Sequence, residues 1–348
     1  MTARAESKRP GQASHGWGER LEAGHRRAVV GIALVACLAG LLVPELDHAT
    51  QFAVLAVGVG AFALPHGAVD PWVAVPQDAP RRAWLRFVTF YLALVGLAIA
   101  AWIAAPLGTL ATFLVASAWH FGQAELDRDR PAFFADGIES LSAGATAILG
   151  PLLFRPDETL TLLGMLVDRD LSSIASSAAF STGLGVWLVS RVVSWAQRIA
   201  MGAAKRDAQP VVIALGQALW LLSFAVLPVL LAFGLYFCLD HSVRHGIRVA
   251  ERFDPSSPSA GFALFVARAM PATLATLLLA GAAWLSWSPG QSEASAMQLL
   301  FVGLAALTLP HVAIGVPKRP AALDESFTAT ASRRNSRSNG YLHGLRRR

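Results

Sequence analysis

The chain has 348 residues, of which 54% are hydrophobic and only 15% are charged. Soluble proteins average about 45–50% apolar and 25% charged residues, so this composition argues against a soluble protein and predicts an integral membrane protein. The net charge at pH 7 is +6, but the basic residues are not grouped into a face that would bind a nucleic acid. We therefore expect a lipid bilayer, and no nucleic acid, as the partner of this chain.

Ten apolar runs along the chain predict the fold. Helices are the expected structure, because backbone groups in lipid must be hydrogen-bonded within their own segment and these runs are too continuously apolar for barrel strands. The expected fold class is all-α, a polytopic membrane bundle of about ten transmembrane helices. The runs lie within residues 28–43, 51–64, 85–105, 107–120, 138–154, 178–193, 211–227, 229–239, 261–284 and 296–309.

The basic residues predict the orientation of these helices. If the N-terminus is cytoplasmic, the external loops carry only Arg155 and Arg169, which is the bias of the positive-inside rule. Both termini are then cytoplasmic, in the inner (plasma) membrane of the cell. Residues 1–27 are expected to be a polar, basic segment, residues 28–316 the transmembrane domain, and residues 317–348 a disordered basic tail.

Five of the nine histidines lie at the ends of even-numbered runs. His66 ends the second run, His120 the fourth, His241 and His245 the eighth, and His311 the tenth. In the topology above, all five lie at the cytoplasmic face. The runs before His66 and His120 are shorter than the ~20 residues of a membrane span, so we expect both helices to continue past these histidines. Ionisable groups inside the hydrocarbon boundary are costly, and they are therefore candidates for function.

His241 and His245 are four residues apart, so on a helix both face the same side and reach one metal ion. A lone buried histidine is more often a hydrogen-bond partner between helices, but His66 and His120 bring the set to four neutral nitrogen ligands. Such a set suits iron, zinc, copper or nickel. No glutamate follows His241 as in a zinc hydrolase, so a redox-active iron with positions for dioxygen is the better interpretation.

Other classes of protein remain open at this point. Histidines in a membrane also occur in metal-ion transporters or channels, although these five share one level instead of forming a path across the bilayer. A haem protein would pair two axial histidines, and no CxxCH attachment motif is present. A di-iron desaturase or hydroxylase needs more histidine motifs than this chain offers.

Four short motifs carry a family resemblance: Leu64-Pro-His-Gly-Ala-Val-Asp70, Ser117-Ala-Trp-His-Phe-Gly122, Tyr236-Phe-Cys-Leu-Asp-His-Ser-Val-Arg-His245 and Leu309-Pro-His311. In order and rough spacing they resemble the motifs of the bacterial Brp/Blh family of β-carotene 15,15′-dioxygenases. The resemblance implies a membrane enzyme that cleaves the central double bond of β-carotene with O2 to give two molecules of all-trans-retinal. It also implies Fe2+ as cofactor and allows for a retinal-binding opsin as a downstream partner.

The resemblance further implies roles for individual residues. The Fe2+ ligands of the family fall on His66, His120, His241 and His245. Asp70 matches the acidic residue that closes the first motif, and ligand histidines commonly donate their second N–H to such a carboxylate. The positions expected beside the ligands or in the substrate pocket are Asp70, His311, Trp119, Phe121 and Tyr236.

Some positions depart from the family pattern. Gln123 stands where a Glu is common, and Asp240 where a Trp is common. Pro71-Trp72 follows Asp70 at a place where a His is common. None of them removes an expected ligand, but they leave a different carotenoid or a shorter apocarotenoid as an alternative substrate. Arg244 lies on a different helical face from the paired histidines, and we expect it to anchor the helix or pair with a carboxylate. Glycines near the histidine-bearing helices are expected to allow close helix packing or passage of the substrate: Gly58, Gly60, Gly122, Gly234 and Gly246.

Overall fold

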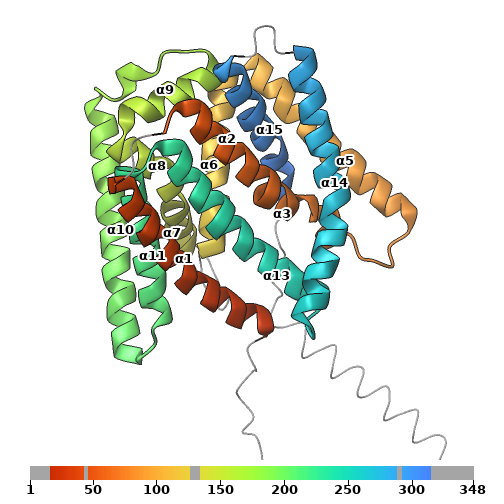
Figure 1. Ribbon diagram of the computed structural model, residues 1–348, viewed down its shortest axis with the longest axis horizontal. Coiled ribbons are helices and arrows are strands. Elements are labelled where there is room, and N and C mark those ends of the chain that lie inside the picture. Colours follow the sequence, from red (N-terminus) through yellow and green to blue (C-terminus); the bar gives the residue numbers. More distant parts are fainter. Residues whose placement is uncertain (1–15, 43–45, 126–133, 288–291, 315–348) are drawn as a thin grey trace, which may run out of the picture. The chain divides into compact units, whose positions relative to one another are not determined.

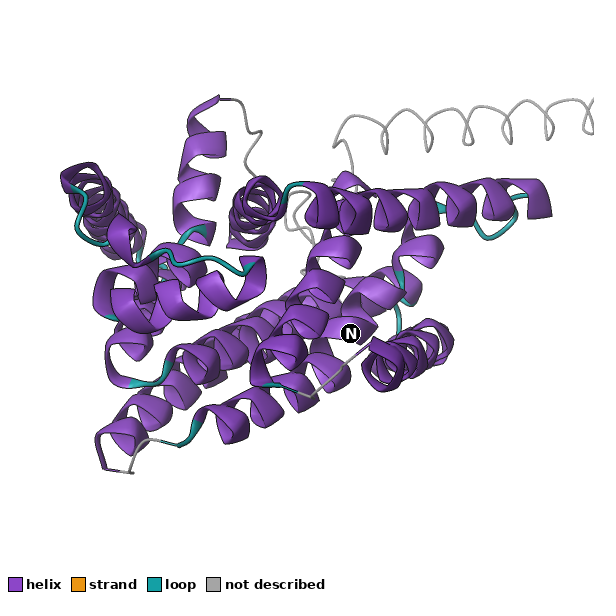
Figure 2. Cartoon of the chain, turned by 90° about the horizontal axis from the view of Figure 1, so that it is seen from above, coloured by secondary structure: helices purple, strands orange, loops and turns teal. Residues whose placement is uncertain are grey.

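The computed structural model describes residues 16–42, 46–125, 134–287 and 292–314. Val43 of the first predicted run, most of the N-terminal segment and the tail 317–348 lie outside the described residues. The chain divides into two units, Met1–Ala313 and Ile314–Arg348, and all contacts of the site lie within the first. Every regular element in the described part of the chain is helical (Figure 2). The predicted all-α class is thus confirmed.

The helices follow one another with short connections (Figure 1). Two π-helical segments, labelled η1 and η3, continue directly from one α-helix into the next, and η2 is a 3-10 turn. In chain order the elements are α1 (Trp17–Leu42), α2 (His48–Gly58), η1 (Val59–Ala63), α3 (Leu64–Ala68), α4 (Asp70–Ala74), α5 (Arg81–Ala104), α6 (Pro106–Glu125), α7 (Phe134–Gly144), α8 (Thr146–Phe154), α9 (Pro156–Val167), η2 (Ser172–Ile174), α10 (Ala178–Lys205), α11 (Gln209–Val226), α12 (Val229–Gly234), η3 (Leu235–Ser242), α13 (Val243–Phe253), α14 (Pro258–Trp287) and α15 (Glu293–Ile314).

The predicted runs all fall largely within these helices, and several helices are suited to a membrane. Among the described residues, six helical segments are long and apolar enough to cross one: Trp17–Leu42, His48–Ala74, Arg81–Ala104, Gln209–Val226, Pro258–Ser286 and Glu293–Ile314. The pair Gly137–Gly144 and Thr146–Phe154, bent by 47°, would be a seventh. The count of about ten spans and the orientation of the termini remain predictions.

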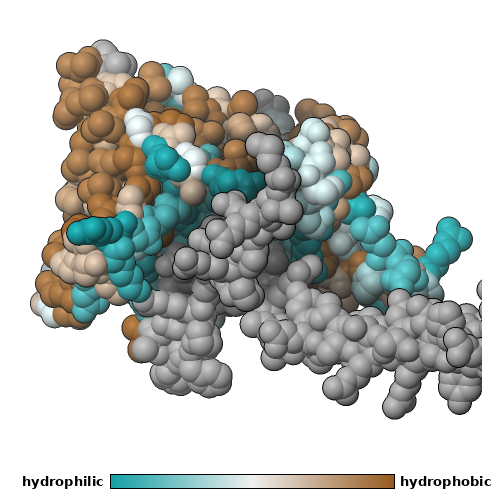
Figure 3. Space-filling view, turned by 90° about the horizontal axis from the view of Figure 1, so that it is seen from below, coloured by the Kyte–Doolittle hydropathy of each residue, from teal (hydrophilic) through white to brown (hydrophobic). Residues whose placement is uncertain are grey.

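The outer helices expose apolar side chains. Val35 of α1, Leu85 of α5 and Leu278 of α14 are 65%, 68% and 74% exposed. Apolar side chains, drawn in brown, cover a broad continuous area in Figure 3. Soluble proteins rarely expose apolar patches of more than a few hundred Å², whereas such a surface is suited to lipid acyl chains. The surface and the apolar helices together indicate a membrane protein.

The helices that bear His66 and His120 continue past these histidines, as predicted. Asp47 caps the N-terminus of α2, because its carboxylate accepts a hydrogen bond of 2.8 Å from the backbone N–H of Thr50. This helix runs through η1 and α3 to Ala68, and α6 runs on to Glu125. His66 therefore lies two residues before the end of α3, and His120 lies five residues before the end of α6.

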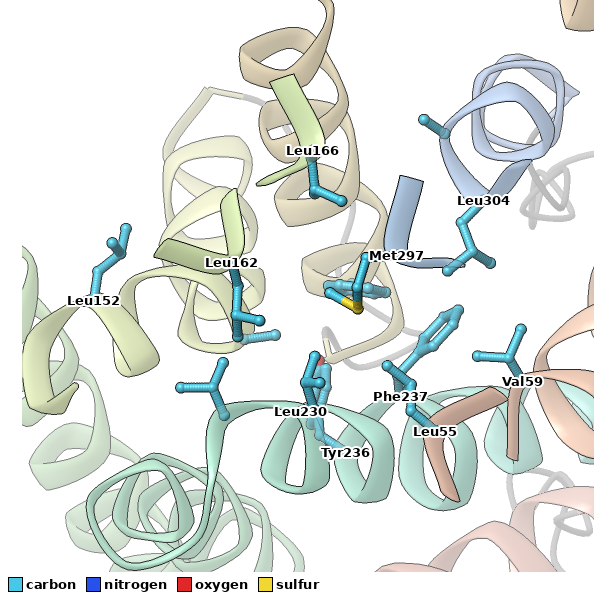
Figure 4. Close-up of a cluster of buried hydrophobic side chains, with 14 of the residues drawn as sticks. Leu55, Val59, Leu152, Leu162, Leu166, Leu230, Tyr236, Phe237, Met297 and Leu304 are labelled. Atoms are coloured by element: carbon cyan, nitrogen blue, oxygen red, sulfur yellow. The ribbon is translucent and has the colours of Figure 1, made fainter. Parts of the chain in front are cut away.

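A buried apolar cluster joins helices from distant parts of the chain (Figure 4). Leu55 of α2 and Val59 of η1 pack in it with Phe237 of η3. Met297 and Leu304 of α15 belong to the same cluster. Burying a large apolar side chain stabilises a fold by about 1.5–3 kcal/mol relative to exposure in water, and in lipid the gain comes mainly from close packing. The cluster thereby holds together three of the helices that bear histidines.

Glycines set the distance between α6 and α7. A Cβ atom at Gly122 would collide with the carbonyl oxygen of Ser140, and one at Gly144 with that of Ala118. Only a residue without a side chain allows two helix backbones to come this close. This contact fixes the position of α6, on which His120 lies two residues before Gly122.

Candidate metal centre

The paired histidines lie at the junction of η3 and α13. His241 belongs to the π-helical segment η3, which hydrogen-bonds from residue i to i+5, and His245 to the α-helix that follows. The Ser242 hydroxyl donates a hydrogen bond of 2.8 Å to the carbonyl of Phe237, five residues earlier. Both imidazoles are buried, and His241 has no exposed surface. π-helical turns are rare and occur often at functional sites.

His66 contacts both members of this pair. It lies on α3, directly after the other π-helical segment, η1. Its ring centroid is 5.6 Å from that of His241 and 5.2 Å from that of His245. The two histidines predicted to face one metal therefore both adjoin a third, from a helix about 175 residues away in the sequence.

His120 of α6 completes a group that could hold a metal ion. Its Nε2 lies 3.1 Å from Nε2 of His241. One ring nitrogen of each of His66, His120 and His241 lies within 4.8 Å of the other two. His245 is at the edge of this group, with its ring centroid 6.5 Å from that of His120. Neutral nitrogen donors in a buried site fit a transition metal such as iron.

His311 of α15 lies next to this group, with its Nε2 3.2 Å from Nε2 of His120. Its ring centroid is 4.6 Å from that of His120 and 5.1 Å from that of His66. The Nδ1 atom of His311 lies 2.8 and 2.9 Å from the two carboxylate oxygens of Asp70, the first residue of α4. Tyr91 of α5 donates its hydroxyl to the same carboxylate over 3.4 Å. The structure thus brings all five histidines and Asp70 together.

A buried charge cluster lies beside the paired histidines. Arg244 is fully buried, donates to Asp240 over 2.6 Å and forms a salt bridge with Glu125 of α6. Its guanidinium also donates to the carbonyl of Ala124 over 3.0 Å. Asp240 accepts a second hydrogen bond, of 2.9 Å, from the indole N–H of Trp220. The expected pairing of Arg244 with a carboxylate is confirmed, and the cluster ties η3 and α13 to α6.

The three aromatic residues expected in the pocket have different surroundings. Phe121 is buried, and its ring centroid is 4.8 Å from that of His241. Tyr236 is buried against Phe121, with ring centroids 5.6 Å apart. Trp119 is 40% exposed and does not line the large cavity beside the histidines. Of these three residues, Phe121 contacts the histidines and also lines that cavity.

The sequence of this chain matches a known family over most of its length. The family model of β-carotene 15,15′-dioxygenase matches residues 57–316. The chain belongs to this family. It is therefore a carotenoid dioxygenase, and all five histidines and Asp70 fall within the matched residues.

A relative in Halobacterium salinarum supports the same assignment. It is described as a probable β-carotene 15,15′-dioxygenase, Blh, and it is 29% identical to this chain over 306 residues. The alignment covers 80% of this chain and 88% of the relative. No solved structure matches this chain.

A large cavity of this carotenoid dioxygenase opens beside the histidines. Its volume is about 640 Å³, within the roughly 300–1,000 Å³ of small-molecule sites. His66, His120 and His311 lie on its wall. Most of its other lining residues are apolar, among them Phe113, Leu163 and Phe233. The walls suit an apolar carotenoid, and the histidines lie among the few polar residues of the lining, with Tyr91, Ser117 and three threonines.

Three residues that the sequence analysis did not single out hold the site in place through polar contacts. Tyr91, Glu125 and Trp220 each bond a charged residue of the site or of the adjacent cluster. Their sequence signal was weak, because Tyr91 and Trp220 stand singly within apolar runs and Glu125 lies in the polar stretch that follows the fourth run. A polar side chain inside a membrane-spanning pattern is the cue that would have found Tyr91.

Proposed function

We propose that this protein is a membrane-embedded, non-haem iron dioxygenase that cleaves the 15,15′ double bond of β-carotene to give two molecules of all-trans-retinal. We further propose that His66, His120, His241 and His245 bind Fe(II). The observation that carries the proposal is the position of the histidine cluster on the wall of a large apolar cavity. The membership in the carotenoid dioxygenase family supports the same conclusion.

The chain contributes two parts to the reaction, a set of nitrogen donors and an apolar cavity. The imidazoles supply neutral nitrogen donors. Bound Fe(II) supplies the binding and activation of dioxygen. In the overall reaction the C15–C15′ double bond and the O–O bond break, and each carbon of the cleaved bond receives one oxygen atom. No other reductant is needed, because both atoms of dioxygen end in the two aldehydes.

The cavity determines which double bond is cleaved. Its apolar walls exclude water and hold a rigid polyene, so the bond that lies against the histidines is the one that reacts. Orientation of this kind contributes about 7–11 kcal/mol to lowering a barrier. A substrate dissolved in the bilayer also fits a chain whose outer helices are apolar. We place the protein in the inner membrane, with both termini and the histidine cluster toward the cytoplasm.

Expression in bacteria that accumulate β-carotene tests the proposal. We expect cells with the wild-type protein to lose β-carotene and gain retinal, as measured by chromatography of their lipid extracts. His241→Ala, at the same expression level, is expected to make no detectable retinal, because it removes a donor at the centre of the cluster. His48→Ala is the matched control, since its ring is 48% exposed and lies on α2.

Two results would argue against the proposal in different ways. Unchanged β-carotene in cells that contain folded, iron-bearing wild-type protein would contradict the proposed substrate. Products of other chain lengths would place the cleavage at a different double bond. Full activity of His241→Ala would contradict the proposed metal site.

A further inference from the structure

His311 makes a polar contact through each of its ring nitrogens. Nδ1 lies 2.8 and 2.9 Å from the two carboxylate oxygens of Asp70, and Nε2 lies 3.2 Å from Nε2 of His120. Both His311 and Asp70 are buried, at 9% and 4% exposure. The orientation of the ring is therefore fixed from one side, while its other nitrogen faces the histidine cluster.

The contact with Asp70 determines which nitrogen of His311 carries the proton. A carboxylate accepts hydrogen bonds, so Nδ1–H is the donor to Asp70. In a neutral imidazole the other nitrogen, Nε2, then has a free lone pair. That lone pair points toward His120. This is the tautomer of a metal-binding histidine whose second nitrogen is held by a carboxylate.

Hydrogen bonding between histidines does not account for both contacts of His120. Its Nε2 lies 3.1 Å from Nε2 of His241 and 3.2 Å from Nε2 of His311. A ring nitrogen has either one proton or one lone pair, so it makes one well-aligned hydrogen bond and not two. Nε2 of His120 therefore has two nitrogen neighbours at contact distance, which is the arrangement expected when lone pairs converge on a cation.

The separations between these nitrogens agree with a shared metal ion. Two nitrogen ligands with metal–nitrogen bonds of about 2.1 Å, at an angle between 90° and the tetrahedral value, are roughly 3.0–3.4 Å apart. The two observed separations, 3.1 and 3.2 Å, both lie in that interval. His311 thus has the same distance relation to His120 as His241 has.

We propose that His311 binds the metal directly through Nε2 and that Asp70 orients it for this role. The inference rests on the proposed function, because it concerns the metal of that site. It assigns to His311 a different role from the one the sequence suggested, which was a place beside the ligands or in the pocket. The donor set then comes from both ends of the matched region, with His66 near its start and His311 near its end.

Titration of the metal-free, full-length protein in detergent with Co(II) tests this proposal. Co(II) is the probe because the energy and intensity of its visible d–d bands depend on the number and arrangement of the ligands. We expect His311→Ala to bind Co(II) at least 100-fold more weakly than the wild type, with shifted d–d bands. Free imidazole should restore the wild-type bands, because it fills the space of the missing ring.

Asp70→Asn separates orientation from direct binding. The amide oxygen still accepts from Nδ1–H of His311, so all ligands remain. We expect wild-type band energies together with a 10–100-fold loss of Co(II) affinity, as is typical when the partner of a ligand histidine is changed. His48→Ala, which removes an exposed histidine, should match the wild type in both affinity and spectrum.

The outcomes separate this inference from the proposed function. Wild-type band energies in His311→Ala, at any affinity, would overturn direct binding by His311, while retinal production by the wild type would leave the proposed function intact. A wild-type protein without Co(II) bands would overturn both. If His311→Ala does not fold, the same titration is made with His311→Gln, which keeps a polar side chain at this position and lacks the imidazole.

Discussion

At the scale of single residues, Arg244 occupies a demanding environment. Its charge is fully buried and is balanced by two carboxylates, those of Asp240 and Glu125. Taking a charge out of solvent costs several kcal/mol, and only complete pairing offsets that cost. The cluster also lies next to His241, so a displacement of Asp240 would move a proposed ligand.

Loss of this arginine is expected to destabilise the protein strongly. Arg244→Met would leave Asp240 and Glu125 buried without their shared partner, and removal of one member of a buried ion pair costs about 3–5 kcal/mol. We expect a clear fall in the unfolding temperature of the purified protein in detergent. Arg82→Met is the matched control, because Arg82 is exposed and such changes usually stay within about 0.5 kcal/mol. Equal unfolding temperatures for the two variants would show that the cluster does not support the fold.

Some residues of the site could be predicted and others could not. The spacing of His241 and His245 and their shared level with His66 and His120 pointed to one cluster, and the structure places these residues together. The contact of His311 with Asp70 joins residues 241 positions apart. No local pattern encodes such a pairing, because it depends on how α15 packs against α3 and α4. The same holds for the hydrogen bond between Trp220 and Asp240.

At the scale of helices, two π-helical segments precede or contain proposed ligands. η1 ends three residues before His66, and η3 contains His241. A π turn adds a residue to the helical repeat and so changes the direction of the side chains that follow it. The apolar runs predicted these helices, but the sequence of an apolar run does not distinguish α-helical from π-helical geometry. The bend between α7 and α8 was hidden as well, because the apolar run 138–154 continues across it.

The crossing of α6 and α7 provides a test at this scale. Alanine in place of glycine usually stabilises a helix by about 0.5–1 kcal/mol. Gly122→Ala is expected to do the opposite, because its methyl group would meet the carbonyl oxygen of Ser140 and push α6 away from α7. Since His120 lies on α6, we also expect weaker Co(II) binding in the titration described above.

Gly108→Ala is the control on the same helix. Nothing lies within 4 Å of a Cβ atom at Gly108, so this variant should be as stable as the wild type, or more so, and bind Co(II) normally. If Gly122→Ala behaved like Gly108→Ala, the close approach of α6 and α7 would not determine the position of His120.

At the scale of the whole molecule, helices with exposed apolar side chains enclose the cavity, and histidine nitrogens lie on its wall. The composition and the ten apolar runs were sufficient to predict a helical membrane protein. The cavity itself could not be predicted, because side chains from helices across the whole chain line it. Its existence connects the family assignment to a physical site for a long apolar substrate.

Removal and replacement of the metal tests whether the site needs a redox-active ion. We expect a chelator to abolish retinal formation by the purified protein and Fe(II) to restore it. Zn(II) also binds imidazole nitrogens, but it has no redox chemistry, so it should occupy the site without restoring activity. Restoration by Zn(II) would contradict the role of iron, and full activity after complete metal removal would contradict any metal at this site.

Labelled dioxygen tests the central claim most directly. Purified, iron-loaded protein is incubated with β-carotene under 18O2, and the aldehydes are reduced at once to retinol so that their oxygen no longer exchanges with water. We expect retinol as the sole cleavage product, with one 18O atom in each molecule. Unlabelled oxygen in half or more of the product, or fragments of unequal length, would contradict a dioxygenase that cleaves β-carotene at its centre.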